Sequence, residues 1–375
     1  MNRKQTVGII TFHCADNFGA VLQTYALQST IEGLMFKVEV IDFQPVSLTS
    51  QYKFQFNFSY IFKEYGIFRL LRMIVGRLKN LHILIPRNRQ FDEFRRKCLN
   101  LSRNTLYNYS ELKKDTYIYD FYITGSDQVW NLEFDDNTNN AYFLQFAPEG
   151  STKLSYAAST GKKINEMTRT VLKKKLYDFN SISVREKSAF NILKEFADVN
   201  VCLDPTLLLK KEHYIQNLNL RKDTNAFIFV YDLEYNDELV KLVNRVSSEK
   251  NMKVISYSNK RKRYKNTYDY LSNKGPIEFL NIIYNANIVI TNSFHGTCFS
   301  IIFNKDFYCI PHQTKGERMI DLLDTVELSN RIIYKADQVE NTSSKIDYKR
   351  VNELLEIERI KSISYLRKAL NISTP

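Results

Sequence analysis

The sequence is poor in cysteine and has no two cysteines at C-x-x-C spacing. Its five cysteines lie far apart: Cys14, Cys98, Cys202, Cys298 and Cys309. An odd, scattered set argues against a disulfide framework and against a cysteine-based zinc site, and it suits a reducing compartment.

Long apolar runs and a leader-like start are missing as well. No apolar stretch reaches about 18 residues, the length that a membrane span requires. Met1 to Gln5 are polar and run straight into a strand-like segment, which is not the pattern of a signal peptide. We therefore expect a cytoplasmic protein.

Several catalytic and binding motifs are absent from the sequence. There is no G-x-S-x-G elbow and Cys14 has only His13 beside it, which disfavours a serine or cysteine hydrolase. We find no recognised nucleic-acid-binding motif and no basic stripe interleaved with aromatic residues, so we expect no nucleic-acid partner. The adjacent Asp135 and Asp136 look like a solvated turn rather than a metal-binding loop, so we expect no metal and no cofactor.

The composition is that of an ordinary globular protein. The chain has 375 residues, of which 44% are hydrophobic and 25% are charged. At roughly 150 residues per domain, this length indicates two domains. Lys and Arg number 53 against 41 Asp and Glu, and the resulting net charge of +12 favours an anionic partner.

Strand-like and helix-like patterns alternate along the chain. Thr6–Phe12 and Lys37–Phe43 read as strands, and the helix expected between them at Gly19–Ile31 completes a parallel crossover unit. Further strands are expected at Phe121–Thr124, Lys153–Ala157, Ser181–Arg185, Val199–Leu203, Ala226–Tyr231, Lys253–Tyr257, Ile288–Thr291 and Phe307–Ile310.

This alternation predicts two α/β domains with a cleft between the carboxyl ends of their sheets, where ligands usually bind. We place an N-terminal domain at residues 1–212 and a C-terminal domain at residues 213–345. A last helix, expected within residues 346–375, would pack back on the N-terminal domain.

The segment Gly66–Ile85 is basic and amphipathic. Its apolar side chains share one helical stripe, and most of its Arg and Lys residues lie elsewhere on the helix. Such a helix either rests on an anionic membrane surface or packs on the core of its own protein, and the second arrangement is the commoner one.

The richest local chemistry follows the strand that ends at Thr291. Asn292 and Ser293 are good N-caps for a helix that begins there, and His295 and Gly296 would lie in its first turn. Unpaired N–H groups in such a turn bind phosphate or carboxylate, and a histidine there can also donate a proton. The alternative is a histidine that only fills the turn.

Three other clusters lie at expected strand ends. His13–Gly19 follows the first strand, and Thr124–Asn131 follows the third with polar groups around the only tryptophan, an arrangement that suits a sugar. Arg185 ends another strand, where its guanidinium would clamp an anion. Ordinary turns, a core tryptophan and a surface ion pair with Glu186 are the plainer interpretations.

At these residues the sequence resembles the polysaccharide pyruvyl transferase family. Six stretches carry the resemblance in this order: Asp16–Leu27, Gly125–Asn131, Ser155–Ser159, Ser183–Glu186, Asp204–Leu208 and Thr291–Gly296. One departure is visible. Family members often read Asp-Arg-Leu-His-Gly where this chain has Asn292-Ser293-Phe294-His295-Gly296, so an arginine is missing at Ser293.

The resemblance implies a GT-B-like pair of Rossmann-like domains and a transferase. Members move the enolpyruvyl unit of phosphoenolpyruvate onto two hydroxyls of a sugar, here in a bacterial surface or capsular polysaccharide precursor. By this analogy His295, Arg185 and Asp127 are the candidate catalytic residues. The candidate donor-binding residues are Asn292, Ser293, Gly296, Thr297, Lys315 and Arg318. The candidate acceptor-binding residues are Asn17, Gln23, Ser126, Gln128, Trp130 and Asn131.

The expected partners are therefore phosphoenolpyruvate as donor substrate and a sugar acceptor. The acceptor could be a lipid-linked oligosaccharide, which would place the enzyme at the inner membrane face. Two alternatives stay open. One is a GT-B glycosyltransferase that uses a nucleotide sugar, which the missing arginine permits. The other is a non-catalytic basic protein that binds an anionic membrane surface.

Overall fold

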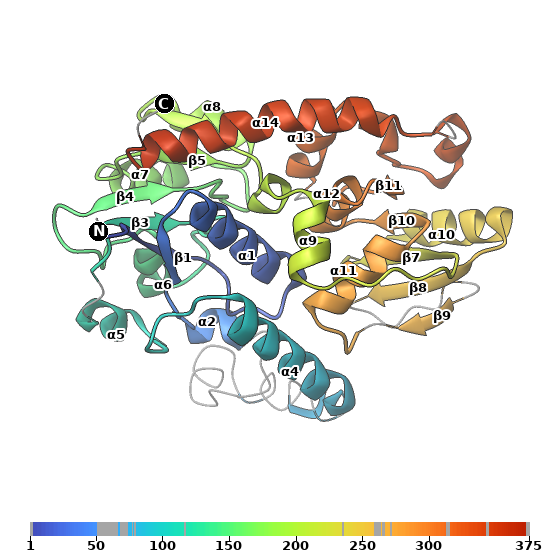
Figure 1. Ribbon diagram of the computed structural model, residues 1–375, viewed down its shortest axis with the longest axis horizontal. Helices are drawn as coiled ribbons and strands as arrows, with labels where there is room; N and C mark the ends of the chain where they lie inside the picture. The colour runs from blue at the N-terminus through green and yellow to red at the C-terminus, as the bar shows by residue number, and fades with distance from the viewer. Residues whose placement is uncertain are drawn as a thin grey trace. The chain divides into compact units, whose positions relative to one another are not determined.

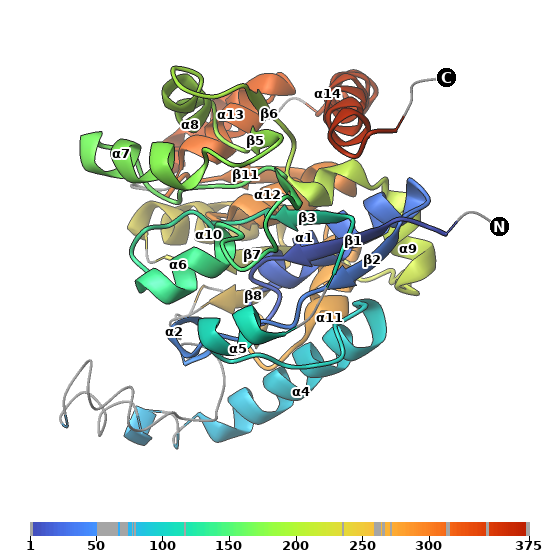
Figure 2. The same cartoon turned by 90° about the vertical axis from the view of Figure 1, so that its left-hand side faces the viewer.

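A computed structural model describes residues 3–50, 80–115, 118–234, 236–258, 267–270, 272–312, 316–342 and 345–372, with residues 67, 74–76, 78 and 264 between these ranges. The chain folds into two compact units. Unit 1 comprises Met1–Leu208 and Lys361–Pro375, and unit 2 comprises Leu209–Ile360. Each unit is an α/β structure built on its own parallel sheet (Figures 1 and 2).

Unit 1 is built on a parallel sheet with the strand order β2-β1-β3-β4. The strands are β1 (Thr6–Ile10), β2 (Lys37–Val40), β3 (Phe121–Thr124) and β4 (Thr152–Ser155). A short parallel pair, β5 (Ile182–Val184) and β6 (Val199–Val201), continues from it through an isolated bridge between Leu154 and Ser181. β1 and β3 are almost continuously apolar because helices cover both faces of the sheet.

Two hydrophobic clusters cover the two faces of this sheet. One joins the strands to α1 (Phe18–Gly33) and to the last turns of α14 (Tyr348–Ala369). The other joins them to α6 (Asp136–Tyr142), α7 (Glu166–Lys175) and α8 (Lys187–Leu193). The remaining helices of unit 1 are α2 (Val46–Thr49), α4 (Leu81–Cys98), α5 (Tyr109–Lys114) and the short η1 (Pro205–Leu208).

The end of α14 packs on unit 1, as the sequence predicts. The Tyr365 hydroxyl donates to the carbonyl oxygen of Ser155 at 2.7 Å, and the Ser362 hydroxyl accepts from the backbone N–H of Leu203 at 3.0 Å. The predicted basic segment Gly66–Ile85 lies largely outside the described residues. Within the described part of the chain, no helix is both long enough and apolar enough to cross a membrane.

Unit 2 has a second parallel sheet, with the order β11-β10-β7-β8-β9. Its strands are β7 (Phe227–Asp232), β8 (Lys253–Ser258), β9 (Thr267–Tyr270), β10 (Ile288–Thr291) and β11 (Asp306–Cys309). Its helices are α9 (Lys211–Asn217), α10 (Asp237–Lys250), α11 (Pro276–Asn285), α12 (Phe294–Ile302) and α13 (Glu317–Thr325), with the short η2 (Ser329–Arg331) and η3 (Ala336–Thr342). Sequence reasoning missed β9, whose four residues (TYDY) are too few to stand out as a strand.

Each sheet has a point where the strand order reverses. In unit 1 this point lies between β1 and β3, and in unit 2 it lies between β7 and β10. In open α/β sheets, ligands bind beyond the carboxyl ends of the strands at such a switch point. The segments after these four strands contain three of the four clusters that the sequence singles out.

Candidate functional site

In unit 1 the turn after β3 has a tightly fixed backbone. Gly125 has φ +113°, and a Cβ there would lie 2.4 Å from the carbonyl oxygen of Tyr156. Asp127 has φ +72°, a conformation that Asp tolerates better than most residues. Glycine is therefore required at position 125, and the Asp127 carboxylate leaves the turn in a direction that an ordinary backbone would not give.

Buried hydrogen bonds hold this turn, and they involve two of the predicted acceptor residues. The Gln23 side-chain oxygen accepts from the Ser126 N–H at 3.1 Å, and the Ser126 hydroxyl donates to the carbonyl oxygen of Ala157 at 2.7 Å. Both side chains are fully buried. In this structure the polar atoms of both side chains form hydrogen bonds inside the protein. Neither side chain is therefore available as the predicted contact to an acceptor.

Trp130 also differs from its prediction as a sugar-stacking residue. Its side chain is fully buried in the core of unit 1, and its ring stacks on Phe143 with a centroid separation of 5.8 Å. The ring has no exposed face, so the plainer interpretation as a core tryptophan is the one that holds.

Three predicted acceptor residues remain partly exposed. Asn17 caps α1, since its side-chain oxygen accepts from the Ala20 N–H at 3.2 Å. Asn131 accepts from the N–H of Glu133 at 3.2 Å, and Gln128 lies beside Gly161. All three are half-buried, so part of each side chain stays open to solvent.

Arg185 lies among carboxylates rather than facing solvent. Its guanidinium is 2.7 Å from Asp204, 3.5 Å from Glu186 and 3.8 Å from Asp127, and the side chain is 3% exposed. Burial alone would lower the pKa of Arg185, but these carboxylates raise it well above its ordinary value. This surrounding differs from the predicted anion clamp, because the arginine charge is already compensated. Its closest partner is Asp204, and Asp127 lies at the longer distance, so the role of Arg185 as an anion clamp stays a prediction.

Sequence reasoning missed a buried pair at the carboxyl edge of the same sheet. His13 follows β1 and Asp42 follows β2, and His13 Nε2 lies 2.8 Å from Asp42 Oδ1. The other ring nitrogen lies 3.2 Å from the carbonyl oxygen of Thr11. Burial would raise the pKa of Asp42, but His13, Thr105 and Gln44 together lower it to about 2. The available signal was their position, because both residues come just after adjacent strands.

A second missed network joins α4 to the start of α1. The guanidinium of Arg95 lies 2.7 Å from Asp16 Oδ1, and both side chains are almost fully buried. Arg87 donates to the carbonyl oxygen of Asp16 at 2.6 Å, and Asn88 donates to its carboxylate. Asp16 directly precedes Asn17, so these contacts from α4 hold the loop that contains Asn17, one of the predicted acceptor residues.

In unit 2 the loop after β7 is tied to the start of α12 through Asn292. Its side-chain oxygen accepts from the Leu233 N–H at 2.8 Å, and its NH2 group donates to Asp232 Oδ1 at 2.9 Å. The Tyr264 hydroxyl donates to the other Asp232 oxygen at 2.7 Å. Asn292 is therefore a residue that builds the switch point, and Asp232 brings a buried carboxylate to it.

The first turn of α12 begins as the sequence predicts. Ser293 is the N-cap, with its hydroxyl accepting from the Gly296 N–H at 3.3 Å. Thr297 is fully buried and donates to the carbonyl oxygen of Ser293 at 3.2 Å. A Cβ on Gly296 would lie 2.5 Å from Thr291 Oγ1. A glycine at position 296 therefore lets α12 pack closely on β10, and its predicted contact with the donor stays a prediction.

His295 and Arg318 lie at the same end of α12. His295 is 7% exposed, and the centroids of its ring and of the Phe294 ring are 5.2 Å apart. The guanidinium of Arg318, from α13, is 5.1 Å from the Phe294 ring centroid. The predicted Lys315 lies outside the described residues. The structure thus places the predicted cation Arg318, from α13, over the ring of Phe294, the residue that precedes His295 in the first turn of α12.

A histidine–carboxylate contact also lies at this edge of unit 2. His312, which follows β11, is 3.0 Å from a carboxylate oxygen of Glu234, which follows β7. The carboxyl edge of unit 2 therefore carries two carboxylates, two histidines and an arginine. Among the described residues, no three or more His, Cys, Asp or Glu side chains are grouped so that they would hold a metal ion.

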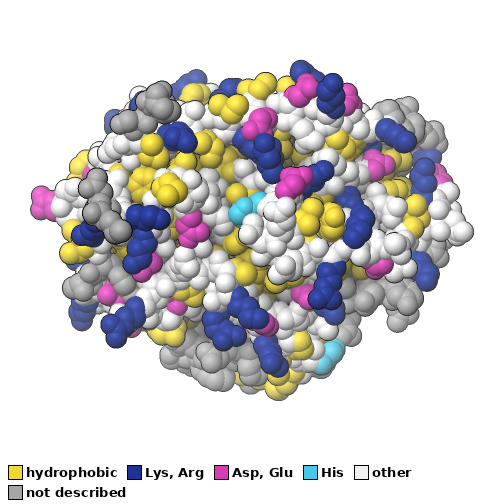
Figure 3. Space-filling view, in the orientation of Figure 1, with side chains coloured by type: hydrophobic (Ala, Val, Ile, Leu, Met, Phe, Trp, Pro, Cys, Tyr) yellow, Lys and Arg dark blue, Asp and Glu magenta, His cyan; other side chains and the backbone are white. Residues whose placement is uncertain are grey.

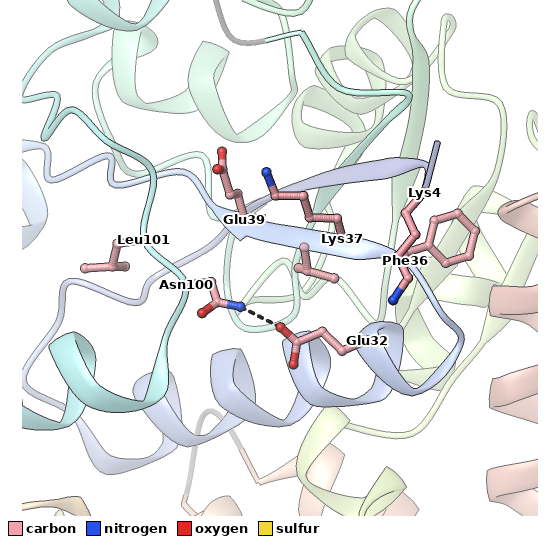
Figure 4. A pocket seen from close by; sticks show the side chains of 8 residues that line it. Lys4, Glu32, Phe36, Lys37, Glu39, Asn100 and Leu101 are labelled. Carbon is pink, nitrogen blue, oxygen red and sulfur yellow. Dashed lines mark hydrogen bonds between the residues drawn. The ribbon is translucent and has the colours of Figure 1, made fainter. Parts of the chain in front are cut away.

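An open pocket of about 570 Å³ lies elsewhere, at the amino end of β2 (Figure 4). Lys37 and Glu39 lie on β2, and Glu32 of α1 accepts a hydrogen bond from Asn100 at 2.6 Å. None of the predicted site residues lines it, and it lies at the opposite end of the strands from the switch point. We do not assign the site to this pocket.

Comparisons with known proteins give a family and a fold. The family model described as polysaccharide pyruvyl transferase matches residues 17–314. No curated protein matches the chain. The chain is similar to the solved structure of S. aureus MnaA with UDP, at a TM-score of 0.52 and 11% identity, covering 99% of this chain and 98% of that one.

A second solved structure gives the same result. UDP-GlcNAc 2-epimerase from Neisseria meningitidis bound to UDP-GlcNAc matches with a TM-score of 0.51 and 7% identity, covering 97% of this chain and 100% of that one. At such low identities the likeness shows the fold alone, a GT-B-like pair of Rossmann-like units. The predicted fold class is confirmed.

Proposed function

Because the chain belongs to the polysaccharide pyruvyl transferase family, we propose that it moves the enolpyruvyl unit of phosphoenolpyruvate onto two hydroxyls of a sugar. The acceptor would be a sugar of a bacterial surface or capsular polysaccharide precursor, such as a lipid-linked oligosaccharide. What supports the proposal is the start of α12, where Ser293 caps the helix, His295 lies in the first turn, and the Arg318 guanidinium lies over the ring of Phe294.

This group suits a small polyanion. The first turn of a helix offers backbone N–H groups and the positive end of the dipole. Arg318 adds a guanidinium, which binds phosphate or carboxylate through two parallel hydrogen bonds. His295 lies in that first turn and is the proposed acid. Lys315 stays a proposed donor contact on sequence grounds.

The reaction follows from protonating the donor at carbon. A proton from His295 forms the methyl group, and the neighbouring carbon becomes an oxocarbenium-like centre. One sugar hydroxyl attacks that carbon, its C–O bond to phosphate breaks and inorganic phosphate leaves with the electron pair. A second hydroxyl then closes the ketal. Preorganised cations around the donor stabilise the charge that develops on the leaving phosphate.

Unit 1 supplies the proposed acceptor side. Asp127 is the proposed base that accepts a hydroxyl proton, and Arg185, 3.8 Å away, holds its carboxylate in place. Asn17, Gln128 and Asn131 are half-buried and are the proposed contacts to sugar hydroxyls. Gln23, Ser126 and Trp130 support the turn from inside and are not part of this proposal.

A nucleotide-sugar donor is the second candidate. The Asn292 NH2 group donates to the Asp232 carboxylate and to the backbone carbonyl of Glu234. A carboxylate at this point would accept hydrogen bonds from ribose hydroxyls but repel a trianion. The two similar solved structures hold UDP or UDP-GlcNAc. A membrane-surface binder is the third candidate; on the face in Figure 3, Lys and Arg are interspersed with Asp and Glu.

The test is phosphate release from phosphoenolpyruvate in the presence of a lipid-linked or synthetic oligosaccharide. The purified full chain should release phosphate only when both substrates are present, and His295→Ala should lose the activity. The exposed His82→Ala is the matched control. If His295→Ala were as fast as the parent, the catalytic assignment would be wrong. Thermal stabilisation by UDP or GDP, but not by phosphoenolpyruvate, would favour the nucleotide-sugar alternative.

A further inference from the structure

Two lysines meet over one aromatic ring at the amino edge of the unit 2 sheet. Lys305 lies in the turn between α12 and β11, and Lys222 lies in the segment before β7. The Lys222 ammonium is 4.8 Å from the centroid of the Tyr284 ring, and the Lys305 ammonium is 5.8 Å from it. This edge is opposite to the one that carries His295, so the pair belongs to no site described above.

Among the described residues, no carboxylate pairs with either lysine, and Asp223, which follows Lys222, bonds instead to Thr224 and Asn225. Across the described ranges, neither ammonium forms an ion pair or a hydrogen bond. The next residue, Asp306, is paired with Arg331 at 2.8 Å. From α14, the Tyr348 hydroxyl donates to the backbone carbonyl of Lys305, and burial raises the pKa of this tyrosine.

The Tyr284 ring attracts each ammonium, but partial burial and the mutual repulsion of the two cations oppose the charge on Lys305. Lys305 is half-buried, and burial, followed by the charge of Lys222, lowers its pKa to about 8. Burial also lowers the pKa of Lys175, but that ammonium donates to the side-chain oxygen of Asn140 at 2.6 Å, which engages its nitrogen. A desolvated lysine beside another cation is the arrangement that activates an amine as a nucleophile.

We propose that Lys305 is a modification site, where the side-chain amine is acylated by small acyl phosphates. The lone pair of the neutral Nζ attacks the acyl carbon, and a C–N bond forms. The bond from that carbon to the phosphate oxygen breaks, phosphate leaves with the electron pair, and the amide nitrogen loses its proton to water. The product has one positive charge instead of two around the Tyr284 ring, which removes the repulsion.

The experiment uses the full chain and acetyl phosphate, with each lysine followed by peptide mass spectrometry from pH 7 to pH 10. An ordinary exposed lysine stays protonated over most of this range. We expect Lys305 to be acylated about tenfold faster than the exposed Lys250 at pH 7.5, since its neutral fraction is far larger. Its rate should level off above pH 8, while the Lys250 rate keeps rising.

A matched pair of variants tests the cause. Lys222→Gln removes the neighbouring charge and should slow acylation of Lys305 severalfold at pH 7.5, whereas Lys222→Arg keeps the charge and should leave the rate unchanged. Lys222 is exposed, so neither substitution disturbs the core. Equal rates at Lys305 and Lys250 in the parent protein would overturn the proposal. So would a Lys305 rate that does not respond to Lys222→Gln.

Discussion

The guanidinium of Arg318 lies 5.1 Å from the centre of the Phe294 ring, immediately before His295 in the chain. A cation over an aromatic face is held there by about 0.5–2 kcal/mol. The family pattern has an arginine at the position of Ser293 and a leucine at that of Phe294. In this chain Ser293 caps the helix instead, and the ring of Phe294 contacts Arg318, which comes from α13.

This relationship predicts a reciprocal exchange. Arg318→Gln should raise the KM for phosphoenolpyruvate by about 10- to 100-fold, because a hydrogen bond to a charged group contributes about 1.5–3 kcal/mol. The double variant Ser293→Arg with Arg318→Gln should recover part of this loss, since it returns the cation to the same end of α12. Steady-state kinetics of phosphate release measures both effects.

The control for this exchange is Arg350→Gln, which removes an exposed arginine paired with Glu327. It should leave the KM unchanged. An unchanged KM in Arg318→Gln would show that the guanidinium does not bind the donor, and a double variant no better than the single one would show that the two positions are not equivalent.

The buried His13–Asp42 pair predicts a specific acid sensitivity. The folded pKa of Asp42 is about 2, below its ordinary value of 3.8, so folding favours the ionised form. This contribution, about 2 kcal/mol, is complete above pH 4 and is lost as the pH falls toward 2. Urea unfolding measured from pH 5 to pH 2 should therefore show a falling stability.

Asp42→Asn should be less stable at neutral pH by about 1–3 kcal/mol, because it weakens the buried hydrogen bond to His13. The loss of stability between pH 4 and pH 2 should be smaller than in the parent protein. A parent and variant whose stabilities fall in parallel over this range would mean that other carboxylates cause the acid sensitivity.

The strands, the fold class and the start of α12 were predictable because they depend on local patterns. Continuous apolar runs mark buried parallel strands, and Ser293 is a strong N-cap. The environment of Arg185 was not predictable, because Asp204 reaches it from 19 residues away in sequence. Its burial depends on the packing of the whole unit, which no local pattern encodes.

The polar clusters show the same division. Sequence reasoning found the turn at Gly125–Asn131 but could not tell which of its side chains point inward. The side chains of Gln23 and Ser126 form hydrogen bonds with buried backbone groups, which need such partners. This pairing can be seen only in the three-dimensional structure. The pairing of His13 with Asp42 likewise needs the register of β1 and β2.

The burial of Trp130 predicts its fluorescence. It is the only tryptophan, so the intrinsic emission reports on this residue alone. Because the ring is fully buried against Phe143, we expect a blue-shifted emission that iodide does not quench. Saturating sugar acceptor should leave the spectrum unchanged. Iodide quenching, or a spectral shift when the acceptor is added, would show that the Trp130 ring is at a surface. It would then support the prediction that the ring stacks on the sugar.

The contact between Gly296 and Thr291 predicts a packing defect with a specific rescue. A Cβ at position 296 would lie 2.5 Å from Thr291 Oγ1 and 3.0 Å from the Tyr231 ring. Overpacking of this kind costs about 1–3 kcal/mol, so Gly296→Ala should lower the free energy of unfolding by that amount. Removing the hydroxyl with Thr291→Ala should return part of the loss in the double variant. If Gly296→Ala instead kept its stability and lost donor affinity, the glycine would serve the ligand rather than the packing of α12 on β10.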